Sequence, residues 1–501
     1  MYSLVTNISF RPILVVYFLI LSCFAATCYV LGVVLYNVFF HPLRNYPGPR
    51  LWAATRIPYA MTSVSGKSHE KMLQLHQTYG SIVRVAPDEL SFNSPEAWND
   101  IMGHRKRGQE ENGKDPDFWK SQKHSVISAN REDHSRMRRV LSHGFSAQAM
   151  LTQQPLIQSY VSLLIEKLRE ACDGGHVPLE MTSWYNWTTF DIIGDLAFGE
   201  PFGCLQDSAY HPWVSLIFDR VRGNAINAVL RKFPCGELLI KILVSKEAIR
   251  RFQTHFELTK EKVAQRLTLE DGRHDFMEVM VNTRESLKLS YPEILDNSSI
   301  LIIAGSETTA TTLSAVTYLL ATHKEAMSKL ADEVRSLFSH EDEIDLLSVQ
   351  KLTYMMAVLN ETLRIFPPVP TAIPRKAPVG GDTIQGQYVP AGTIIGVWQW
   401  PMYHNPENFS LPDSFIPERW LDDPLFSQDR KEGFQPFSFG PRNCLGKNLA
   451  YAEMRLILAR IVWNFDLSLD ARSEGWLEKN QAFTLWMKPD LYLYLTPRAT
   501  A

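Results

Sequence analysis

A single cysteine in a glycine-bounded loop near the end of the chain constrains the fold more than any other feature. The segment from Phe437 to Gly446 reads FSFGPRNCLG, and an amphipathic helix is expected soon after it, from Leu449 to Val462. We expect Gly440 and Gly446 to adopt backbone conformations that other residues resist. The loop can then close tightly around the sulfur of Cys444.

The surroundings of this cysteine favour a thiolate. The N–H groups of the loop and the positive end of the following helix both stabilise negative charge. Phe437 would shield the sulfur from water, and Arg442 offers a forked cation to a nearby anion. A lone cysteine is more often a small buried hydrophobe. The full spacing F-x-x-G-x-R-x-C-x-G instead favours a protected thiolate without a partner cysteine, as an axial ligand to haem iron requires.

The same spacing is the signature of the cytochrome P450 superfamily of haem-thiolate monooxygenases, which this sequence resembles over essentially its whole length. The resemblance implies that Cys444 ligates the iron of haem b, with Phe437 and Gly440 beside it. It also implies the cytochrome P450 fold, which is mainly α with small β-sheets, behind a single N-terminal transmembrane helix.

Apolar periodicity supports a mainly helical chain. Helices are expected over 151–170, 324–338 and 352–366, with a long helix from Pro292 to about Ala321. Short strands are expected over 81–85, 90–92, 388–389 and 393–397, and a C-terminal hairpin is expected to pair 483–487 with 491–495.

Composition excludes several classes of protein. A hydrophobic content of 45% with 21% charged residues fits a globular protein with a large core. The net charge of -3 gives no general attraction to nucleic acid. The six cysteines are scattered without metal-binding or disulfide spacing, which indicates a reducing compartment. Because no second linker interrupts the sequence, we predict one haem-thiolate catalytic domain over 51–501.

The N-terminal region predicts a membrane anchor. Residues 13–40 carry no charge and are long enough to cross a bilayer. A buried core helix and a cleaved signal peptide are the alternatives, but apolar sequence continues well beyond the about 7–15 residues of a signal peptide. Arg44, Arg50 and Arg56 follow the run and only Arg11 precedes it, so the positive-inside rule places the catalytic domain in the cytoplasm. We assign the anchor to 1–40 and a proline-rich hinge to 41–50, and the resemblance implies the endoplasmic reticulum membrane.

A second motif lies in the centre of the long helix, where residues 304–312 read AGSETTATT. Gly and Thr are poor helix formers, and small residues let another body lie flat against a helix. A loosely packed polar face is the alternative. The string matches the family pattern A/G-G-x-D/E-T-T/S. That resemblance implies that Thr308 delivers protons to dioxygen with Glu307 as its acidic neighbour, and that Ala304 and Gly305 lie over the haem.

The resemblance also assigns roles to charged residues outside these two motifs. Glu361 and Arg364 stand three residues apart on one helix, which by itself predicts an ordinary surface ion pair. The family pattern in FIPERW (415–420) implies that Arg419 completes a buried Glu–Arg–Arg cluster with a structural role.

The two haem propionates need cations, and the candidates are Arg442, Arg375, Arg138 and His134.

The sequence contains no G-x-G-x-x-G or Walker A motif, so electrons must come from elsewhere. The resemblance implies NADPH-cytochrome P450 reductase in the same membrane as donor. Its docking face is predicted to contain Arg136, Arg138, Arg139, Arg442, Lys447 and Arg455. The other expected partners are O2, membrane lipid and an apolar small-molecule substrate.

Several segments are similar to fungal secondary-metabolite members close to the isotrichodermin C-15 hydroxylase-like group, including 37–59 and 187–205. This similarity implies hydroxylation or epoxidation of a terpenoid, polyketide or alkaloid. The substrate is expected to touch 114–130, 300–304, 369–373 and 483–486. Two other functions remain open, namely a haem-thiolate isomerase or dehydratase that uses no external electrons, and a haem-binding sensor or carrier.

Overall fold

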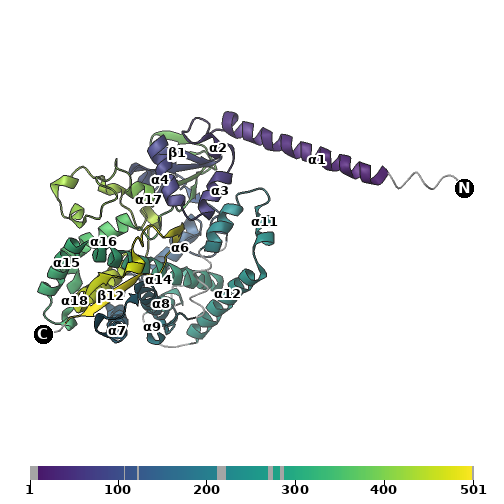
Figure 1. Cartoon of the computed structure of the whole chain (residues 1–501). Helices are drawn as coiled ribbons and strands as arrows, with labels where there is room; N and C mark the ends of the chain where they lie inside the picture. The colour runs from purple at the N-terminus through teal and green to yellow at the C-terminus, as the bar shows by residue number, and fades with distance from the viewer. Residues whose placement is uncertain are drawn as a thin grey trace.

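A computed structural model of the chain describes residues 10–106, 108–120, 123–211, 222–268, 275–281 and 287–498. Helices make up most of the body, and helix α1 (Phe10–Leu35) projects from it as a rod (Figure 1). The described helices of the body are α2 (Arg50–Ala54), α3 (Ile57–Val64), α4 (Ser68–Tyr79), α5 (Glu96–Met102), α6 (Arg131–Leu141), α7 (Ala147–Ala171), α8 (Met181–Phe198), α9 (Cys204–Asp207), α11 (Gly236–Leu243), α12 (Lys246–Leu267), α13 (Phe276–Val281), α14 (Tyr291–Thr322), α15 (Lys324–Leu337), α16 (Thr353–Ile365), α17 (Gln399–Tyr403) and α18 (Lys447–Asn464). The predicted mainly helical fold is confirmed.

Four small sheets lie among the helices. The largest has the strand order β1-β2-β8-β5-β3, built from β1 (Ile82–Ala86), β2 (Glu89–Phe92), β8 (Ile394–Val397), β5 (Arg375–Lys376) and β3 (Gly113–Lys114). A second sheet has the order β4-β12-β9, from β4 (Leu179–Glu180), β12 (Tyr492–Pro497) and β9 (Phe465–Leu469). Two hairpins complete the set, β6 (Asp382–Ile384) with β7 (Gln387–Val389) and β10 (Gln481–Phe483) with β11 (Leu485–Met487).

The predicted C-terminal hairpin is wrong in its pairing. The chain turns back earlier, at Thr484, whose φ of 76° lets Phe483 pair with Leu485. Strand β12 instead pairs with β9 and β4. Pro489 has no N–H to donate, and the carbonyl of Leu491 accepts a hydrogen bond from the N–H of Met181 at 2.7 Å. The two apolar runs therefore diverge into different sheets.

Helix α14 is the centre of the core. It begins with a capping box in which the side chains of Ser290 and Glu293 satisfy free backbone N–H groups, with Pro292 in the first turn. It packs most extensively against α8 and also contacts α16 and α18. Most of its length is buried, so the long helix predicted from the sequence is an interior one.

The segment after α1 is fixed to the body. Asn37 donates its side-chain amide to the carbonyl of Ala54 at 2.9 Å, and its own carbonyl accepts from Arg84 at 2.9 Å. The N–H of Arg84 bonds the carbonyl of Pro47 at 2.7 Å, and a Cβ on Gly48 would lie 2.4 Å from the carbonyl oxygen of Arg84. These contacts hold the proline-rich segment against strand β1.

A buried charge cluster joins α16 to the segment around Trp420. Arg364 donates to both carboxylate oxygens of Glu361 at 2.8 and 2.9 Å, and Arg419 donates to one of them at 3.3 Å. Trp420 donates to the other oxygen at 2.9 Å, and Arg419 also pairs with Asp429. The side chains of these ion pairs are fully buried, so this is not the ordinary surface pair that the i,i+3 spacing alone predicted. The sequence analysis did not identify Asp429 as a member.

We expect Glu361→Gln to lower the free energy of unfolding by about 3–5 kcal/mol, because it leaves two buried guanidinium groups short of an anion. Thermal and denaturant unfolding measure the change. Glu325→Gln is the matched control, since Glu325 is 84% exposed and only forms an i,i+4 pair with Lys329; it should unfold like the wild type. Equal stability of the two variants would contradict the structural role of Glu361.

Candidate haem and substrate site

The cysteine loop is closed by backbone hydrogen bonds. The N–H of Cys444 donates to the carbonyl of Phe437 at 2.8 Å, and that of Asn443 donates to Gly440 at 3.1 Å. Gly440 has a φ of 74°, and a Cβ there would lie 2.0 Å from the carbonyl oxygen of Met102. Only glycine fits at this position. The expectation for Gly446 is wrong, because its φ is -85° and an added Cβ would meet Phe145 only at an ordinary 3.6 Å.

The Cys444 side chain is accessible but lies in a densely packed part of the protein. Its surface is exposed, while burial of the surrounding region raises the pKa of its thiol. The N–H of Gly446 and the charges of Arg138 and Lys447 act in the opposite direction and lower that pKa. These groups act as expected, but burial outweighs them, so the pKa of the free thiol lies above its ordinary value. A cation bound at the sulfur would stabilise the ionised form.

Helix α6 clamps this loop. Arg138 donates to the carbonyl of Asn443 at 2.6 Å and also to its side-chain oxygen. On the other side, the ring of Phe437 lies 5.1 Å from that of Tyr451 and 5.8 Å from the ammonium of Lys447. The residues on both sides of the sulfur are therefore held by neighbours from other elements.

Five basic side chains gather near the loop and form what we call the cationic cluster: Lys114, His134, Arg138, Arg375 and Arg442. Strands β3 and β5 place Lys114 opposite Arg375. Arg442 is paired with Glu111 at 2.6 Å and donates to the carbonyl of Ala129 at 2.9 Å. Arg375 is 3% exposed, and no carboxylate within the described residues forms an ion pair with it. Positive charge therefore exceeds negative charge in this interior region.

The pKa values of the cluster reflect this excess. Burial, then the charges of Arg442 and Arg138, lowers the pKa of His134 to about 3. Burial, then the charge of Arg442, lowers the pKa of Arg375 to about 10. Burial, then the charges of Arg375 and Arg442, lowers the pKa of Lys114 well below its usual range. A bound dianion would relieve this repulsion. The two propionates of haem match that need.

Two members of this region were not identified from the sequence. Lys114 was expected only in a substrate-contacting loop, and Glu111 was not singled out at all. Both act on the cluster because two-residue strands bring 113–114 beside 375–376. Strands this short leave no periodic signal from which the pairing could be predicted.

Helix α14 has one open position in its buried centre. Ala304 is exposed, whereas Leu301, Ile302 and Ser306 are buried. The hydroxyl of Thr308 lies on the same face one turn later and donates to the carbonyl of Ala304 at 2.6 Å. Gly305 has a different neighbour, since a Cβ there would lie 2.7 Å from the side chain of Ile193 on α8. This glycine allows close helix packing, and its contact with a cofactor stays a prediction.

Glu307 lies on another face of α14, and its partner was not found from the sequence. Its carboxylate is 3% exposed and forms an ion pair with Lys488, which also donates to the hydroxyl of Thr311 at 2.9 Å. Burial raises the pKa of Glu307, while the charge of Lys488 lowers it. Thr308 is not among the hydrogen-bond partners described for this carboxylate.

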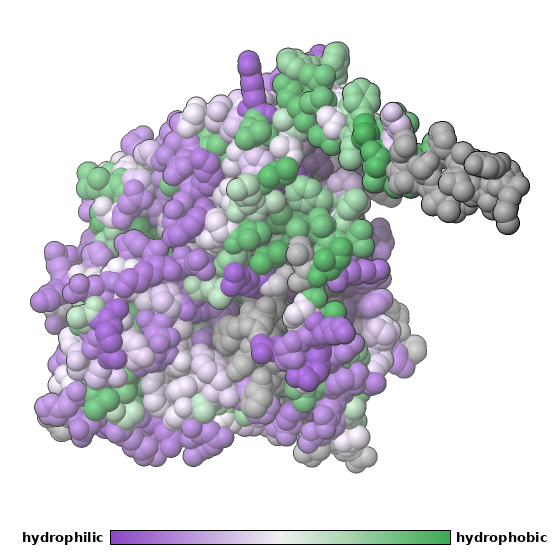
Figure 2. Space-filling view, turned by 45° about the vertical axis from the view of Figure 1, so that its right-hand side comes forward, coloured by the Kyte–Doolittle hydropathy of each residue, from purple (hydrophilic) through white to green (hydrophobic). Residues whose placement is uncertain are grey.

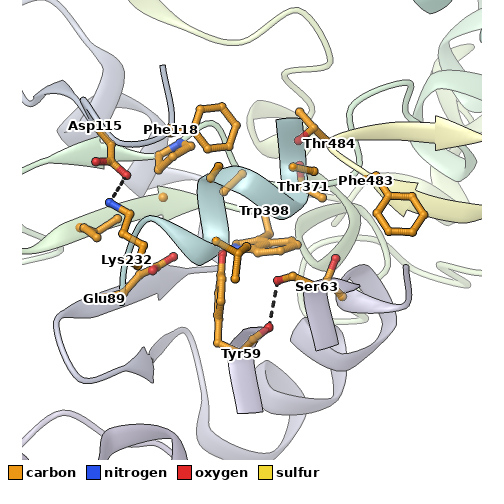
Figure 3. Close-up of a pocket in the computed structure, with 18 of the residues that line it drawn as sticks. Tyr59, Ser63, Glu89, Asp115, Phe118, Lys232, Thr371, Trp398, Phe483 and Thr484 are labelled. Atoms are coloured by element: carbon orange, nitrogen blue, oxygen red, sulfur yellow. Dashed lines mark hydrogen bonds and ion pairs between the residues drawn. The ribbon is translucent and has the colours of Figure 1, made fainter. Parts of the chain in front are cut away.

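A pocket lies between α3, the largest sheet and the β10–β11 hairpin (Figure 3). Its walls include Tyr59, Trp398 and Phe483, which lie around the space that Figure 3 shows. Three of the four segments expected to touch substrate contribute to its walls, namely 114–130, 369–373 and 483–486. The fourth, 300–304, does not, and neither does Cys444. The ion pair of Asp115 and Lys232, at 2.5 Å, closes one side.

The predicted docking face is smaller than the sequence indicated. Arg139 and Lys447 are exposed. Arg136 is neutralised by Glu293, and the side chain of Arg442 is only 3% exposed, so Arg442 is wrong as a docking residue. Its buried charge belongs to the cationic cluster.

Comparison with known proteins agrees with this geometry. The family model described as cytochrome P450 matches residues 46–495. The chain is 46% identical to the trichothecene C-15 hydroxylase of Fusarium sporotrichioides over 483 residues, covering 96% of this chain and 98% of that protein. It is 45% identical to the cytochrome P450 monooxygenase tpeC of Talaromyces stipitatus over 498 residues, 97% of each. The averantin hydroxylase of Dothistroma septosporum is 43% identical over 481 residues, covering 95% and 90%.

Three observations lead to one identity: an accessible thiol in a tight loop, a cationic cluster with more positive than negative charge, and a family match over residues 46–495. The chain belongs to the cytochrome P450 family and is a haem-dependent monooxygenase.

Proposed function

We propose that the chain holds haem b and inserts one oxygen atom from O2 into an apolar secondary-metabolite intermediate, by hydroxylation or epoxidation. Haem bound through a thiolate supplies the activation of dioxygen. The observation that carries the proposal is the pairing of an accessible thiol at Cys444 with an interior excess of positive charge. A thiolate ligand and two propionates are the anionic groups that these two features fit.

The residues have separate tasks in this proposal. Cys444 ligates the iron, with Phe437 and Gly440 shaping its loop. Arg375, Arg442, Arg138 and His134 hold the propionates, and Lys114 joins them from the opposite strand. The exposed Ala304, with Gly305 beside it, leaves room for a flat group against α14. These roles use side chains that lie near one another in the folded chain.

Thr308 and Glu307 move protons in the proposed reaction. The hydroxyl of Thr308 is held by the carbonyl of Ala304, next to the open position on α14. From there it would donate a proton into the space beside Ala304, and Glu307 would replace that proton. An isomerase or dehydratase needs no such relay and no external electrons, and a sensor or carrier would leave it idle.

The proposed substrate is a terpenoid, polyketide or alkaloid. The pocket walls contain Tyr59, Phe118, Trp398 and Phe483, which provide aromatic surface for an apolar body. The names of the relatives support this class, since they include a trichothecene hydroxylase and an averantin hydroxylase. Because Cys444 does not line this pocket, we assign it to the approach of the substrate.

We propose that electrons come from NADPH through a separate cytochrome P450 reductase in the same membrane. The sequence has no dinucleotide-binding fingerprint of its own. We also propose that the chain is divided into an anchor (1–40), a hinge (41–50) and a catalytic domain (51–501). In this arrangement the anchor crosses the endoplasmic reticulum membrane once and the catalytic domain faces the cytoplasm.

Exposed apolar surface supports contact with lipid. Two described helices are long and apolar enough to span a membrane: Leu14–Phe40, whose most apolar window is fully exposed, and Tyr291–Thr322, whose window is 72% buried. Helix α3 exposes Ile57 and Met61, and α11 exposes Leu238 and Ile242. Figure 2 shows a hydrophobic area on the side of the body from which the anchor leaves. Lipid covering this area would shield apolar side chains from water.

Replacing Cys444 with Ser tests the cofactor site. We expect loss of the haem-thiolate absorption bands and of all product formation, because a serine hydroxyl does not ionise to a comparable ligand. The measurements are the reduced carbon monoxide difference spectrum and turnover with NADPH and reductase. Cys235→Ser is the control, since Cys235 is an exposed cysteine next to α11, and it should keep both. A haem-thiolate spectrum in the Cys444 variant would exclude this ligand.

Thr308→Ala tests proton delivery. The variant should keep the haem spectrum. Its yield of product per NADPH should fall by about tenfold or more, because a general acid contributes at least that factor to the rate. The electrons would appear as hydrogen peroxide instead. Thr317→Ala, on the same helix and bonded to the carbonyl of Leu313 at 2.8 Å, is the control. Unchanged coupling in Thr308→Ala, or product without NADPH and oxygen consumption, would favour the alternative enzymes.

The anchor and orientation can be tested in sealed microsomes. We expect the full chain to stay in the membrane after alkaline carbonate washing, since residues 14–35 bury their apolar surface in lipid. Protease added outside should digest the catalytic domain without permeabilisation. A catalytic domain digested only after detergent treatment would reverse the proposed orientation.

A further inference from the structure

A buried lysine from the C-terminal segment contacts the acid of α14. Lys488 directly follows strand β11 and forms an ion pair with Glu307, and each side chain is 3% exposed. The ammonium also donates to the hydroxyl of Thr311 at 2.9 Å. An unpaired ammonium is costly at such a buried place, so the carboxylate and the lysine depend on each other.

Only one oxygen of Glu307 is engaged. Oε1 accepts from Lys488 and, at 3.4 Å, from Thr311. Oε2 is buried and has no hydrogen-bond partner within the described part of the chain. A buried carboxylate oxygen of this kind is a place for a proton or an ordered water.

Few titratable groups face this carboxylate. Besides Lys488, the phenol of Tyr210 is close enough to feel the charge of Glu307. The phenol oxygen accepts hydrogen bonds from Asn186 at 2.9 Å and Ser183 at 3.3 Å. Lys488 is therefore the one cation that the described residues place against Glu307.

The ion pair also determines which oxygen of Glu307 can exchange a proton. Glu307 and Thr311 are one turn apart on α14 and share the face that Lys488 covers, whereas Ala304 and Thr308 share the neighbouring open face. With Oε1 held by Lys488, rotation of the carboxyl group is restricted. Oε2 then remains as the oxygen through which a proton can leave.

We propose that Lys488 is a positioning residue for proton delivery, holding Glu307 by one oxygen so that the other serves the Thr308 relay. This inference rests on the proposed roles of Glu307 and Thr308. Each proton that leaves Oε2 toward Thr308 is replaced by one from water, so the carboxyl group returns to its starting state and no other reactant is needed.

The electrostatics of the pair determine the direction in which removal of Lys488 should shift the pKa of Glu307. Burial raises the pKa of Glu307, and Lys488 lowers it. Removing Lys488 leaves only the hydrogen bond from Thr311 to oppose burial, so the pKa of Glu307 rises further and the acid holds its proton more tightly. A purely structural pair could be replaced by apolar side chains without such a pH effect.

The first measurement is product formed per NADPH as a function of pH, in the full-length haem-loaded enzyme with reductase. In Lys488→Met we expect a severalfold loss of coupling and a shift of the Glu307 transition to higher pH by more than about one unit. Lys488→Arg should keep the wild-type profile, and Glu307→Gln should lack the transition. Lys479→Met, at an exposed lysine bonded to the carbonyl of Glu474, should match the wild type.

The second measurement is thermal unfolding, which needs no turnover. A carboxyl whose folded pKa is raised is stabilising below its unfolded pKa and loses that contribution as pH rises through the folded pKa. The melting-temperature difference between wild type and Lys488→Met should therefore widen as the pH rises above the ordinary pKa of a carboxyl group. In Glu307→Gln/Lys488→Met this pH dependence should disappear, and that double variant should fold even if Lys488→Met does not.

The outcomes distinguish a failure of the proposed role of Lys488 from a failure of the proposed role of Glu307. If Glu307→Gln stays fully coupled, the proposed role of Glu307 is wrong, and the positioning role of Lys488 falls with it. If Glu307→Gln uncouples while Lys488→Met keeps the wild-type profile and melting curve, only the role of Lys488 is overturned. An uncoupled Lys488→Arg with a normal melting curve would also contradict the proposal, because that variant preserves the cation.

Discussion

The site depends on the tight loop that surrounds one thiol. The N–H of Cys444 is tied to Phe437, and the turn before it exists only because Gly440 fits against the carbonyl of Met102. Arg138 then fixes the residue preceding the cysteine from another helix. Burial raises the pKa of the thiol, so this enclosure favours the ionised sulfur only when a cation is bound to it. The thiolate that we propose at Cys444 therefore depends on the bound iron.

The same enclosure explains the unusual distribution of charge. The interior holds the Glu361 cluster, in which carboxylates balance the guanidinium groups, and the cationic cluster, in which Glu111 stands against three arginines and Lys114. The balanced cluster is satisfied by the chain alone, as expected of a structural element. The unbalanced one is satisfied only with an added dianion. Charge balance therefore distinguishes the structural cluster from the one that we propose holds the cofactor.

The sequence predicted the long helices and the cysteine loop well because both depend on local pattern. The periodicity over 324–338 corresponds to α15, and the motif around Cys444 is one continuous segment. Features that depend on distant pairing were missed or wrong. Lys114 reaches Arg375 through two-residue strands, and the C-terminal hairpin formed one strand earlier than predicted. Neither the short strands nor the hairpin has a periodicity from which its pairing could be predicted. Asp429 and Lys488 are single charged residues that folding brings next to partners distant in the sequence.

Two buried carboxyl groups near the centre of α14 show why partner identity decides function. Glu453 on α18 is buried and hydrogen-bonded to Thr309, and burial raises its pKa to about 8 because no cation opposes it. It is therefore mostly protonated at neutral pH and acts as a neutral hydrogen-bonding group. Glu307 is equally buried, but Lys488 favours its ionised form. A proton relay needs an acid that both loses and regains its proton near working pH. Among the described residues, Lys488 pairs with Glu307 and no cation pairs with Glu453, so we propose that this pairing, and not the buried acidic side chain itself, marks Glu307 as the relay residue.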